Sequence, residues 1–197
     1  LPDALPILEA KRTAGGDKTV SASLDLSGGY QKKNFLTVLA ALEVLQQKGW
    51  RVSPFSTEAL ARVRALTGLR GRWEQISADP RVVVDVGHNE AGITEVVRQL
   101  ASVPYRDLHV VTGFVRDKSI SRVLDLLPRD ARYYFTQAAI PRALEAPELA
   151  SRAAAHGLTG EVFPVVKDAL AAARAAAGPE DLVLVTGSIF LVAEVLV

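Results

Sequence analysis

Over residues 81–197, short apolar runs alternate with stretches in which apolar residues recur at every third or fourth position. The runs predict strands, and the three-to-four spacing predicts amphipathic helices. We predict strands at residues 81–86, 107–114, 131–136, 161–166 and 181–187. We predict helices near residues 90–102, 119–127, 145–156, 167–178 and 188–197. This alternation predicts an α/β domain with a doubly wound, mostly parallel sheet of about five to six strands.

The ends of these strands predict where a ligand binds. Several strands are apolar throughout, as is typical of strands covered by helices on both faces. Right-handed crossovers place the carboxyl ends of all parallel strands at one edge. Ligands of open α/β sheets bind beyond that edge, where helix N-termini favour anions. We therefore expect a ligand site at the residues that follow the strands: Asp85, Thr112, Gly113, Thr136, Thr186, Gly187 and Ser188.

The first third of the chain has a different pattern. Residues 1–20 show little periodicity, and Gly15-Gly16-Asp17 predicts a hairpin or loop turn. We predict a strand at 19–26, a long helix that opens at residues 30–34 and stops near residue 49, and a short helix at 56–66. Gln31 and Asn34 lie on one side of the first helical turn. Their amides could bind a ligand or cap local backbone, and chemistry alone favours capping.

Three positions on the predicted edge and its approach carry possible ligand chemistry. Arg72 follows a glycine in the segment Gly-Leu-Arg-Gly-Arg-Trp-Glu, so its guanidinium could reach an anion or be a solvated linker arginine. Asp85 ends an apolar strand, where a carboxylate must be solvated or hydrogen-bonded. It could accept from ribose hydroxyls, coordinate a cation or cap the next helix. His88 could contact a phosphate or ribose, or pack as a neutral turn residue.

Other polar residues near the edge have structural interpretations. Ser188 opens the last helix and is interpreted as its N-cap. His109 and His156 are interpreted as structural, and no second histidine stands near His88, so we expect no metal site. Asp117-Lys118 could be a functional pair or a solvated loop. The sequence has no nucleophile elbow, no Gly-x-Gly-x-x-Gly fingerprint and no complete phosphate-binding loop, so these residues name no reaction.

Composition excludes several classes of partner. The 23 basic and 22 acidic residues leave a net charge of +1, which gives no reason to expect nucleic acid or a membrane surface as partner. The chain has no cysteine, which fits a reducing compartment. Its apolar runs are shorter than the roughly 20 residues of a membrane span. Residues 1–10 lack a signal-peptide pattern. We expect a soluble, cytoplasmic protein.

Five segments together resemble the carboxyl-terminal half of the folylpolyglutamate synthase/dihydrofolate synthase family, within the Mur ligase superfamily. They share its order and spacing over about 170 residues, although each is weakly specific alone. The more common family form has proline after His-Asn, where this sequence has Glu90. The segments are Leu-Ser-Gly-Gly-Tyr-Gln-Lys-Lys-Asn (26–34), Gly-Arg-Trp-Glu (71–74), Val-Asp-Val-Gly-His-Asn (84–89), Gly-Phe-Val-Arg-Asp-Lys (113–118) and Val-Thr-Gly-Ser-Ile-Phe-Leu-Val-Ala-Glu-Val (185–195).

The resemblance implies an ATP-dependent amide ligase. In that family ATP phosphorylates a carboxylate of dihydropteroate or a folate, and the amine of L-glutamate attacks the acyl phosphate. The resemblance implies that Asn34 faces the adenine and that Asp85 holds the ribose hydroxyls. It implies that Arg72 reaches the ATP phosphates and that His88 lies beside the nucleotide, so these two are the candidate catalytic residues. An arginine there would stabilise charge on the transferring phosphoryl group.

Further expectations follow from the same resemblance. Ser188 and Lys118 are candidates for the glutamate or folate side of the cleft. Residues 1–68 are expected to be the end of the central ATPase domain with the hinge, and residues 69–197 the Rossmann-like carboxyl-terminal domain. The phosphate-binding loop and the ligands of Mg²⁺ would belong to an amino-terminal domain that this chain lacks. The fragment is therefore expected to be inactive alone, with that domain, ATP, L-glutamate and dihydropteroate or folate as partners.

Two alternatives remain open. One is a stand-alone module that binds a nucleotide or another anion and has a regulatory or partner role. The other is a different Mur-type ligase that acts on peptidoglycan precursors. The helix start at Gln31 to Asn34 and the Gly-Arg-Trp segment weigh against that second alternative.

Overall fold

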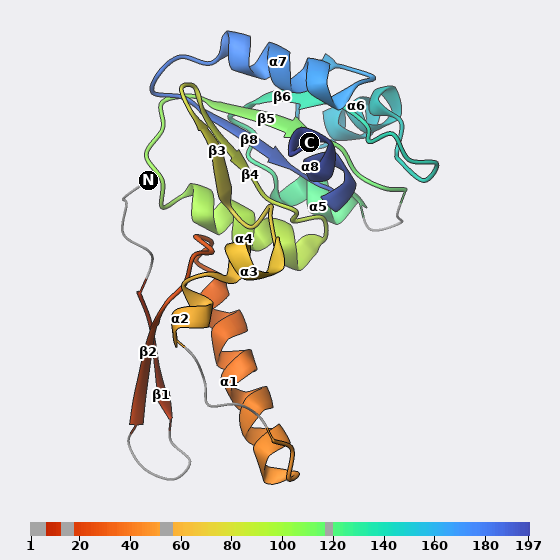
Figure 1. Cartoon of the computed structure of the whole chain (residues 1–197). Coiled ribbons are helices and arrows are strands. Elements are labelled where there is room, and N and C mark those ends of the chain that lie inside the picture. Colours follow the sequence, from red (N-terminus) through yellow and green to blue (C-terminus); the bar gives the residue numbers. More distant parts are fainter. Residues whose placement is uncertain (1–6, 13–17, 52–56, 117–119) are drawn as a thin grey trace. The chain divides into compact units, whose positions relative to one another are not determined.

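The computed structural model describes residues 7–12, 18–51, 57–116 and 120–197 (Figure 1). The chain divides into two compact units, Leu1–Arg70 and Gly71–Val197. The larger unit contains the sheet that the alternating pattern predicts, and the smaller unit contains a hairpin and three helices. In the part of the chain that the structure describes, no helix is both long and apolar enough to cross a bilayer.

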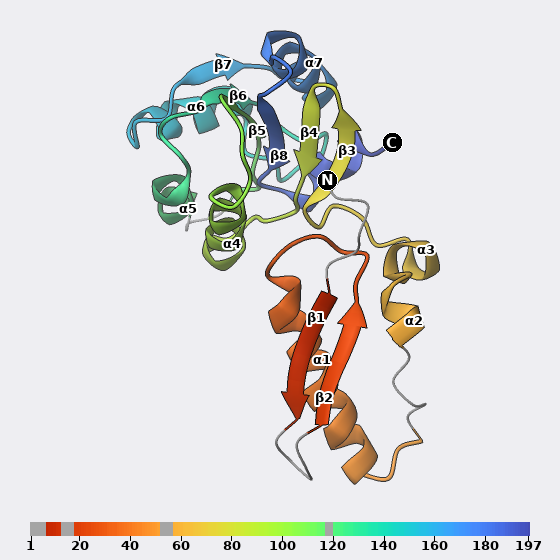
Figure 2. The ribbon, with the colours of Figure 1, turned by 90° about the vertical axis from the view of Figure 1, so that its left-hand side faces the viewer.

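The larger unit is built on a six-stranded sheet with the order β3-β4-β8-β5-β6-β7. All neighbouring strands are parallel except β3 and β4, which are antiparallel. The strands run from β7 at one side of the sheet to β3 at the other (Figure 2). The prediction of a mostly parallel α/β sheet is confirmed. The strands are β3 (Glu74–Ala78), β4 (Arg81–Val84), β5 (Leu108–Thr112), β6 (Arg132–Phe135), β7 (Gly160–Val162) and β8 (Leu182–Thr186).

Helices cover both faces of this sheet because successive strand residues point to opposite sides. Leu182 and Leu184 of β8 belong to one hydrophobic cluster, with α4 (Glu90–Leu100), α5 (Ile120–Leu126) and α6 (Ala146–Ala154). Val183 and Val185 belong to the other cluster, with α7 (Val166–Ala176) and α8 (Ile189–Val195). The predicted double winding is therefore present.

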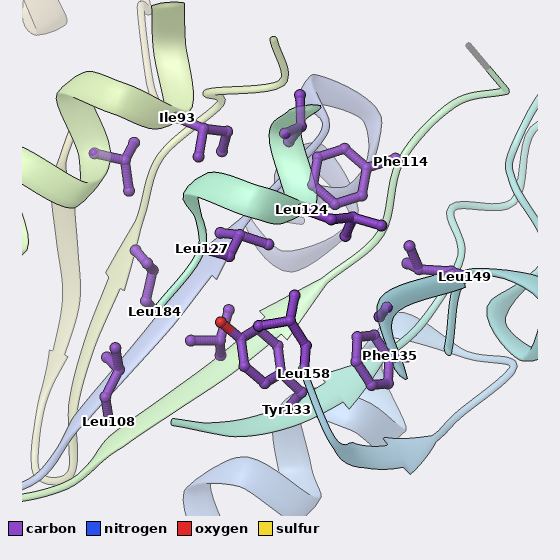
Figure 3. Close-up of a cluster of buried hydrophobic side chains, with 14 of the residues drawn as sticks. Ile93, Leu108, Phe114, Leu124, Leu127, Tyr133, Phe135, Leu149, Leu158 and Leu184 are labelled. Atoms are coloured by element: carbon purple, nitrogen blue, oxygen red, sulfur yellow. The ribbon is translucent and has the colours of Figure 1, made fainter. Parts of the chain in front are cut away.

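Figure 3 shows the hydrophobic cluster between the sheet and helices α4, α5 and α6. Ile93 of α4 and Leu124 of α5 belong to this cluster together with Leu184 of β8 and with Tyr133 and Phe135 of β6, whose rings are stacked. The two ring centroids are 5.5 Å apart. Burial of such apolar area stabilises the unit by about 25 cal/mol per Å².

Two edge strands differ from the prediction. The polar residues of β3 broke the apolar pattern, but pairing with β4 supplies its hydrogen bonds, so the sheet gains an antiparallel edge strand. The predicted strand 161–166 is shorter, because β7 ends at Val162 and α7 begins at Val166. All three residues of β7 are exposed. Pro164, which follows, cannot donate a hydrogen bond to a ladder.

The smaller unit is an antiparallel hairpin with helices. Strands β1 (Ile7–Arg12) and β2 (Lys18–Ser23) pair with each other, and β1 was not predicted. The predicted turn at Gly15-Gly16-Asp17 lies outside the described residues. Helix α1 (Gln31–Gln47) ends just before Gly49, which has a positive φ of 81°, as the glycine stop predicts. The short predicted helix is divided into α2 (Thr57–Leu60) and α3 (Val63–Thr67).

Among the described residues of the smaller unit, the hydrophobic cluster is small. Phe35 is buried with Ala22, and Leu39 and Leu60 pack against them. Other apolar side chains of α1 are exposed. Among them are Leu36, Val38, Val44 and Leu45.

Candidate functional site

The carboxyl edge of the larger unit brings the loops after β4 and β8 together. The N–H of Gly187 donates to the carbonyl oxygen of Gly87 at 2.9 Å. The hydroxyl of Thr186 donates to the same oxygen at 3.3 Å. Thr112 of β5 joins them through a 3.0 Å bond from its hydroxyl to the carbonyl of Thr186. The prediction that these strand ends share one edge is confirmed.

Asp85 connects two segments of this edge. It is only 3% exposed, and both carboxylate oxygens accept backbone hydrogen bonds. Oδ1 accepts from the N–H of Gly87 and Oδ2 from the N–H of Trp73, each at 2.8 Å. Charge-assisted bonds of this kind offset the cost of burying a carboxylate. Asp85 thereby holds the loop after β4 against the segment that precedes β3.

The segment held by Asp85 is the turn Gly71–Glu74. Gly71 has a φ of 72°, and a Cβ atom there would lie 2.8 Å from Val86 and 2.9 Å from Val192. This position therefore requires glycine. Trp73 also has a positive φ, of 50°, and its side chain is 2% exposed.

Arg72 stands in the middle of that turn and is half-buried. The carbonyl of Gly71 accepts from the N–H of Val86 at 3.0 Å, and the N–H of Gly71 donates to Glu74 Oε2 at 2.8 Å. The guanidinium of Arg72 has no ion-pair partner among the described residues. The backbone around Arg72 is thus fixed while its charge stays available to a ligand.

His88 lies on the exposed part of the next loop. Its Nδ1 is 3.0 Å from the carbonyl oxygen of Val86. Because a carbonyl only accepts, Nδ1 is the donor, and Nε2 is left to accept from a ligand in the neutral ring. The N-cap of α4 is Asn89, whose Oδ1 accepts from the N–H of Gly92 at 2.8 Å. The helix-cap alternative for Asp85 is therefore wrong, since its bonds go to Trp73 and Gly87 instead.

Ser188 is the N-cap of α8, as interpreted from the sequence. Its Oγ accepts from the N–H of Phe190 at 3.2 Å, and the residue is 4% exposed. Lys118 and Asp117 lie outside the described residues. The structure thus gives Ser188 a structural bond, and its role toward a substrate stays a prediction.

Asn34 belongs to the smaller unit. Its Nδ2 donates to Oε1 of Gln31 at 2.8 Å. The N-cap of α1 is Tyr30, which makes no side-chain cap bond. The side-chain amides of Gln31 and Asn34 therefore do not cap the helix, because they bond to each other. Asn34 is exposed at the start of α1.

The opposite, amino edge of the sheet holds His109. This side chain is fully buried, with Nδ1 3.0 Å from the hydroxyl of Tyr134 and Nε2 3.7 Å from Asp181. Burial lowers the pKa of the imidazole, although Asp181 opposes that shift. His156 lies 2.6 Å from Asp125 at the ends of two helices. Both histidines lie in structural contacts, as interpreted.

Sequence reasoning did not single out Glu74, which lies in the turn beside Arg72. Its carboxylate is 5% exposed and bonds to the amide three residues earlier. The signal was present, since a carboxylate three residues from a glycine in a turn can bond to local backbone. In the described part of the chain, no three His, Cys, Asp or Glu side chains are grouped to hold a metal ion.

Comparisons with known proteins identify the family of the larger unit. The family model of the Mur ligase, glutamate ligase domain, matches residues 71–189. A probable bifunctional folylpolyglutamate synthase/dihydropteroate synthase of Haloferax volcanii is 34% identical over 179 residues, which are 90% of this chain and 20% of that protein. The chain therefore spans about a fifth of that relative.

Two solved structures have the same fold. Escherichia coli FolC in complex with DHPP and ADP is 31% identical, with a TM-score of 0.72 over 92% of this chain and 42% of that one. A bifunctional folylpolyglutamate synthase/dihydrofolate synthase from Yersinia pestis, complexed with AMPPNP and Mn ion, is 26% identical, with a TM-score of 0.71 and the same two coverages. The family match covers more than half of the chain, so this protein belongs to the Mur ligase family through its glutamate ligase domain.

Proposed function

We propose that this chain is part of a cytoplasmic, ATP-dependent ligase that joins L-glutamate to dihydropteroate or a folate. The terminal phosphoryl group of ATP passes to a carboxylate oxygen, which yields ADP and an acyl phosphate. The amine of glutamate then attacks the acyl carbon, an amide forms, and phosphate leaves. The observation that carries this proposal is the pair of loops that Asp85 joins, because they present Arg72 and His88 at one edge.

The proposed roles at the nucleotide follow from that geometry and from the family. Arg72 would bind the phosphates, because its guanidinium is available and its backbone is held. His88 would lie beside the nucleotide with Nε2 as acceptor. Asp85 would accept from the ribose hydroxyls, because its carboxylate lies at the carboxyl end of β4, in the loop that also carries His88.

The remaining proposed contacts involve Asn34, Ser188 and Lys118. Asn34 would face the adenine, and its exposed amide at the start of α1 supports this role. Ser188 and Lys118 would serve the glutamate or folate side. The Yersinia pestis relative was solved with Mn ion, and the described residues of this chain include no cluster of three or more His, Cys, Asp or Glu side chains that could hold a metal ion. We therefore assign no metal-dependent step to them and place the Mg²⁺ ligands elsewhere in the enzyme.

We also propose that residues 1–68 complete a central ATPase domain and that residues 69–197 form the glutamate ligase domain. The exposed apolar side chains of α1 support this assignment, because another part of the enzyme would cover them. Trp50 is 67% exposed just after that helix. The chain alone would then bind nucleotide weakly and would not turn over.

The test is an assay of the full-length coding sequence that contains this chain. With ATP, Mg²⁺, L-glutamate and either dihydropteroate or tetrahydrofolate, we expect one ADP and one phosphate for each amide formed. Omission of glutamate should stop amide formation. A full-length protein that binds ADP and forms no amide with either acceptor would contradict the proposal and favour a stand-alone nucleotide-binding module.

A further inference from the structure

Two buried carboxylates flank Arg72. On one side, Oε2 of Glu74 accepts from the N–H of Gly71 at 2.8 Å. On the other side, Oδ2 of Asp85 accepts from the N–H of Trp73 at 2.8 Å. Glu74 and Asp85 are 5% and 3% exposed. The amide before Arg72 and the amide after it are therefore both held by an ionisable side chain inside the fold.

This turn is unfavourable without such support. A left-handed backbone is unfavourable for a residue other than glycine, and Trp73 has a φ of 50°. Burial of a carboxylate is also costly unless hydrogen bonds compensate it. Strained backbone persists where surrounding contacts determine it, and such positions concentrate at functional sites. Here the strain and the buried charge meet around one arginine.

We propose that Glu74 is a positioning residue for Arg72. Its carboxylate holds the Gly71 amide, which orients the turn so that the guanidinium meets the phosphates of ATP. The proposal rests on the proposed function, because it requires that Arg72 act on ATP. Glu74 itself touches no substrate, so its effect must pass through Arg72. A misplacement of about 1 Å can cost on the order of 100-fold in rate.

The test is a double-mutant cycle on kcat/KM for ATP in the full-length protein. Glu74→Met keeps the side-chain volume and removes the acceptor, so we expect a 10- to 100-fold loss, on the order of such a misplacement. Arg72→Ala should lose at least as much. In the Arg72→Ala background, Glu74→Met should cause no further loss, because its effect passes through Arg72. Glu74→Gln should stay within about threefold of wild type, because its amide oxygen still accepts from Gly71.

A matched control is Glu148→Met, which removes an exposed glutamate that pairs with Arg152 on α6. It should leave kcat/KM unchanged. If the losses in kcat/KM of Glu74→Met and Arg72→Ala multiply in the double variant, the positioning role of Glu74 is overturned, while the proposed function stands. An Arg72→Ala protein with wild-type kinetics, or a wild-type protein without turnover, would overturn the proposed function together with this inference. If Glu74→Met does not fold, Glu74→Gln becomes the deciding variant. A tenfold loss of kcat/KM in Glu74→Gln would then overturn the proposal.

Discussion

Asp85 and Asp181 are buried aspartates at opposite edges of the same sheet. Asp85 follows β4 at the carboxyl edge, and Asp181 precedes β8 at the amino edge. Each is 3% exposed, and each accepts two backbone hydrogen bonds. Asp85 holds Trp73 and Gly87, whereas Asp181 holds Gly178 at 2.6 Å and Asp107 at 3.2 Å.

The difference lies in the arginine beside each aspartate. Arg106 lies 3.2 Å from Asp181, so the guanidinium at the amino edge forms an ion pair within the protein. Arg72 at the carboxyl edge has no ion-pair partner among the residues that the structure describes. Each aspartate thus accepts two backbone hydrogen bonds, but the neighbouring arginine is paired at the amino edge and has no ion-pair partner among the described residues at the carboxyl edge. We expect substitutions at the two edges to affect different properties.

The largest effect is expected from Asp85→Ala. Two backbone amides lose their acceptor, so the turn that carries Arg72 and the loop that carries His88 both become free to move. We expect kcat/KM for ATP of the full-length protein to fall by about 100-fold or more, the order of loss that misplaced groups cause. Asp181→Ala is the matched control and should stay within threefold. Equal losses in both variants would remove the functional distinction between the edges.

Asp181→Ala should instead lower stability. The backbone amides of Gly178 and Asp107 lose their partly buried bonds to Asp181, and each such hydrogen bond typically contributes roughly 1 kcal/mol. We expect the free energy of unfolding of the 197-residue chain to fall by about 2 kcal/mol in urea titrations. The matched variant is Asp107→Ala, whose exposed side chain pairs with Arg106. It should change stability by less than about 1 kcal/mol.

His109 should make the amino edge sensitive to pH. Burial lowers the pKa of its imidazole, so between that folded-state value and about 6.5 the unfolded chain binds a proton that the folded chain does not. The free energy of unfolding should therefore fall as the pH falls below about 6.5. In His109→Gln this part of the loss should be absent. Parallel pH curves for the two proteins would refute the assignment.

The smallest effect is expected from Ser188→Ala. Loss of an N-cap acceptor typically costs about 1 kcal/mol, whereas glycine at the same position costs only a few tenths. Ser188→Ala should therefore unfold at lower urea concentration than Ser188→Gly. The reverse order would show that the bond to Phe190 contributes little to the stability of this edge.

Much of the fold follows from the sequence, because burial on a strand or helix has a local period. The alternation after residue 80 predicts the five parallel strands and the helices that cover them, and the predicted stop near residue 49 matches the end of α1. The edge strand β3 was not predicted, because its polar residues show no such period. Its ladder depends on β4, which follows later in the chain.

The site divides in the same way. Residue types and the carboxyl-end rule predict Asp85, His88 and Ser188 at one edge, and resemblance adds Arg72. The sequence cannot predict that β8, the last strand, lies between β4 and β5, which brings Thr186 to Gly87 across 99 residues. Nor does it predict that Asp85 holds Trp73 or that Glu74 holds Gly71. Local periodicity determines which residues are buried, but hydrogen-bond partners depend on strand order and backbone conformation, which only the tertiary structure decides.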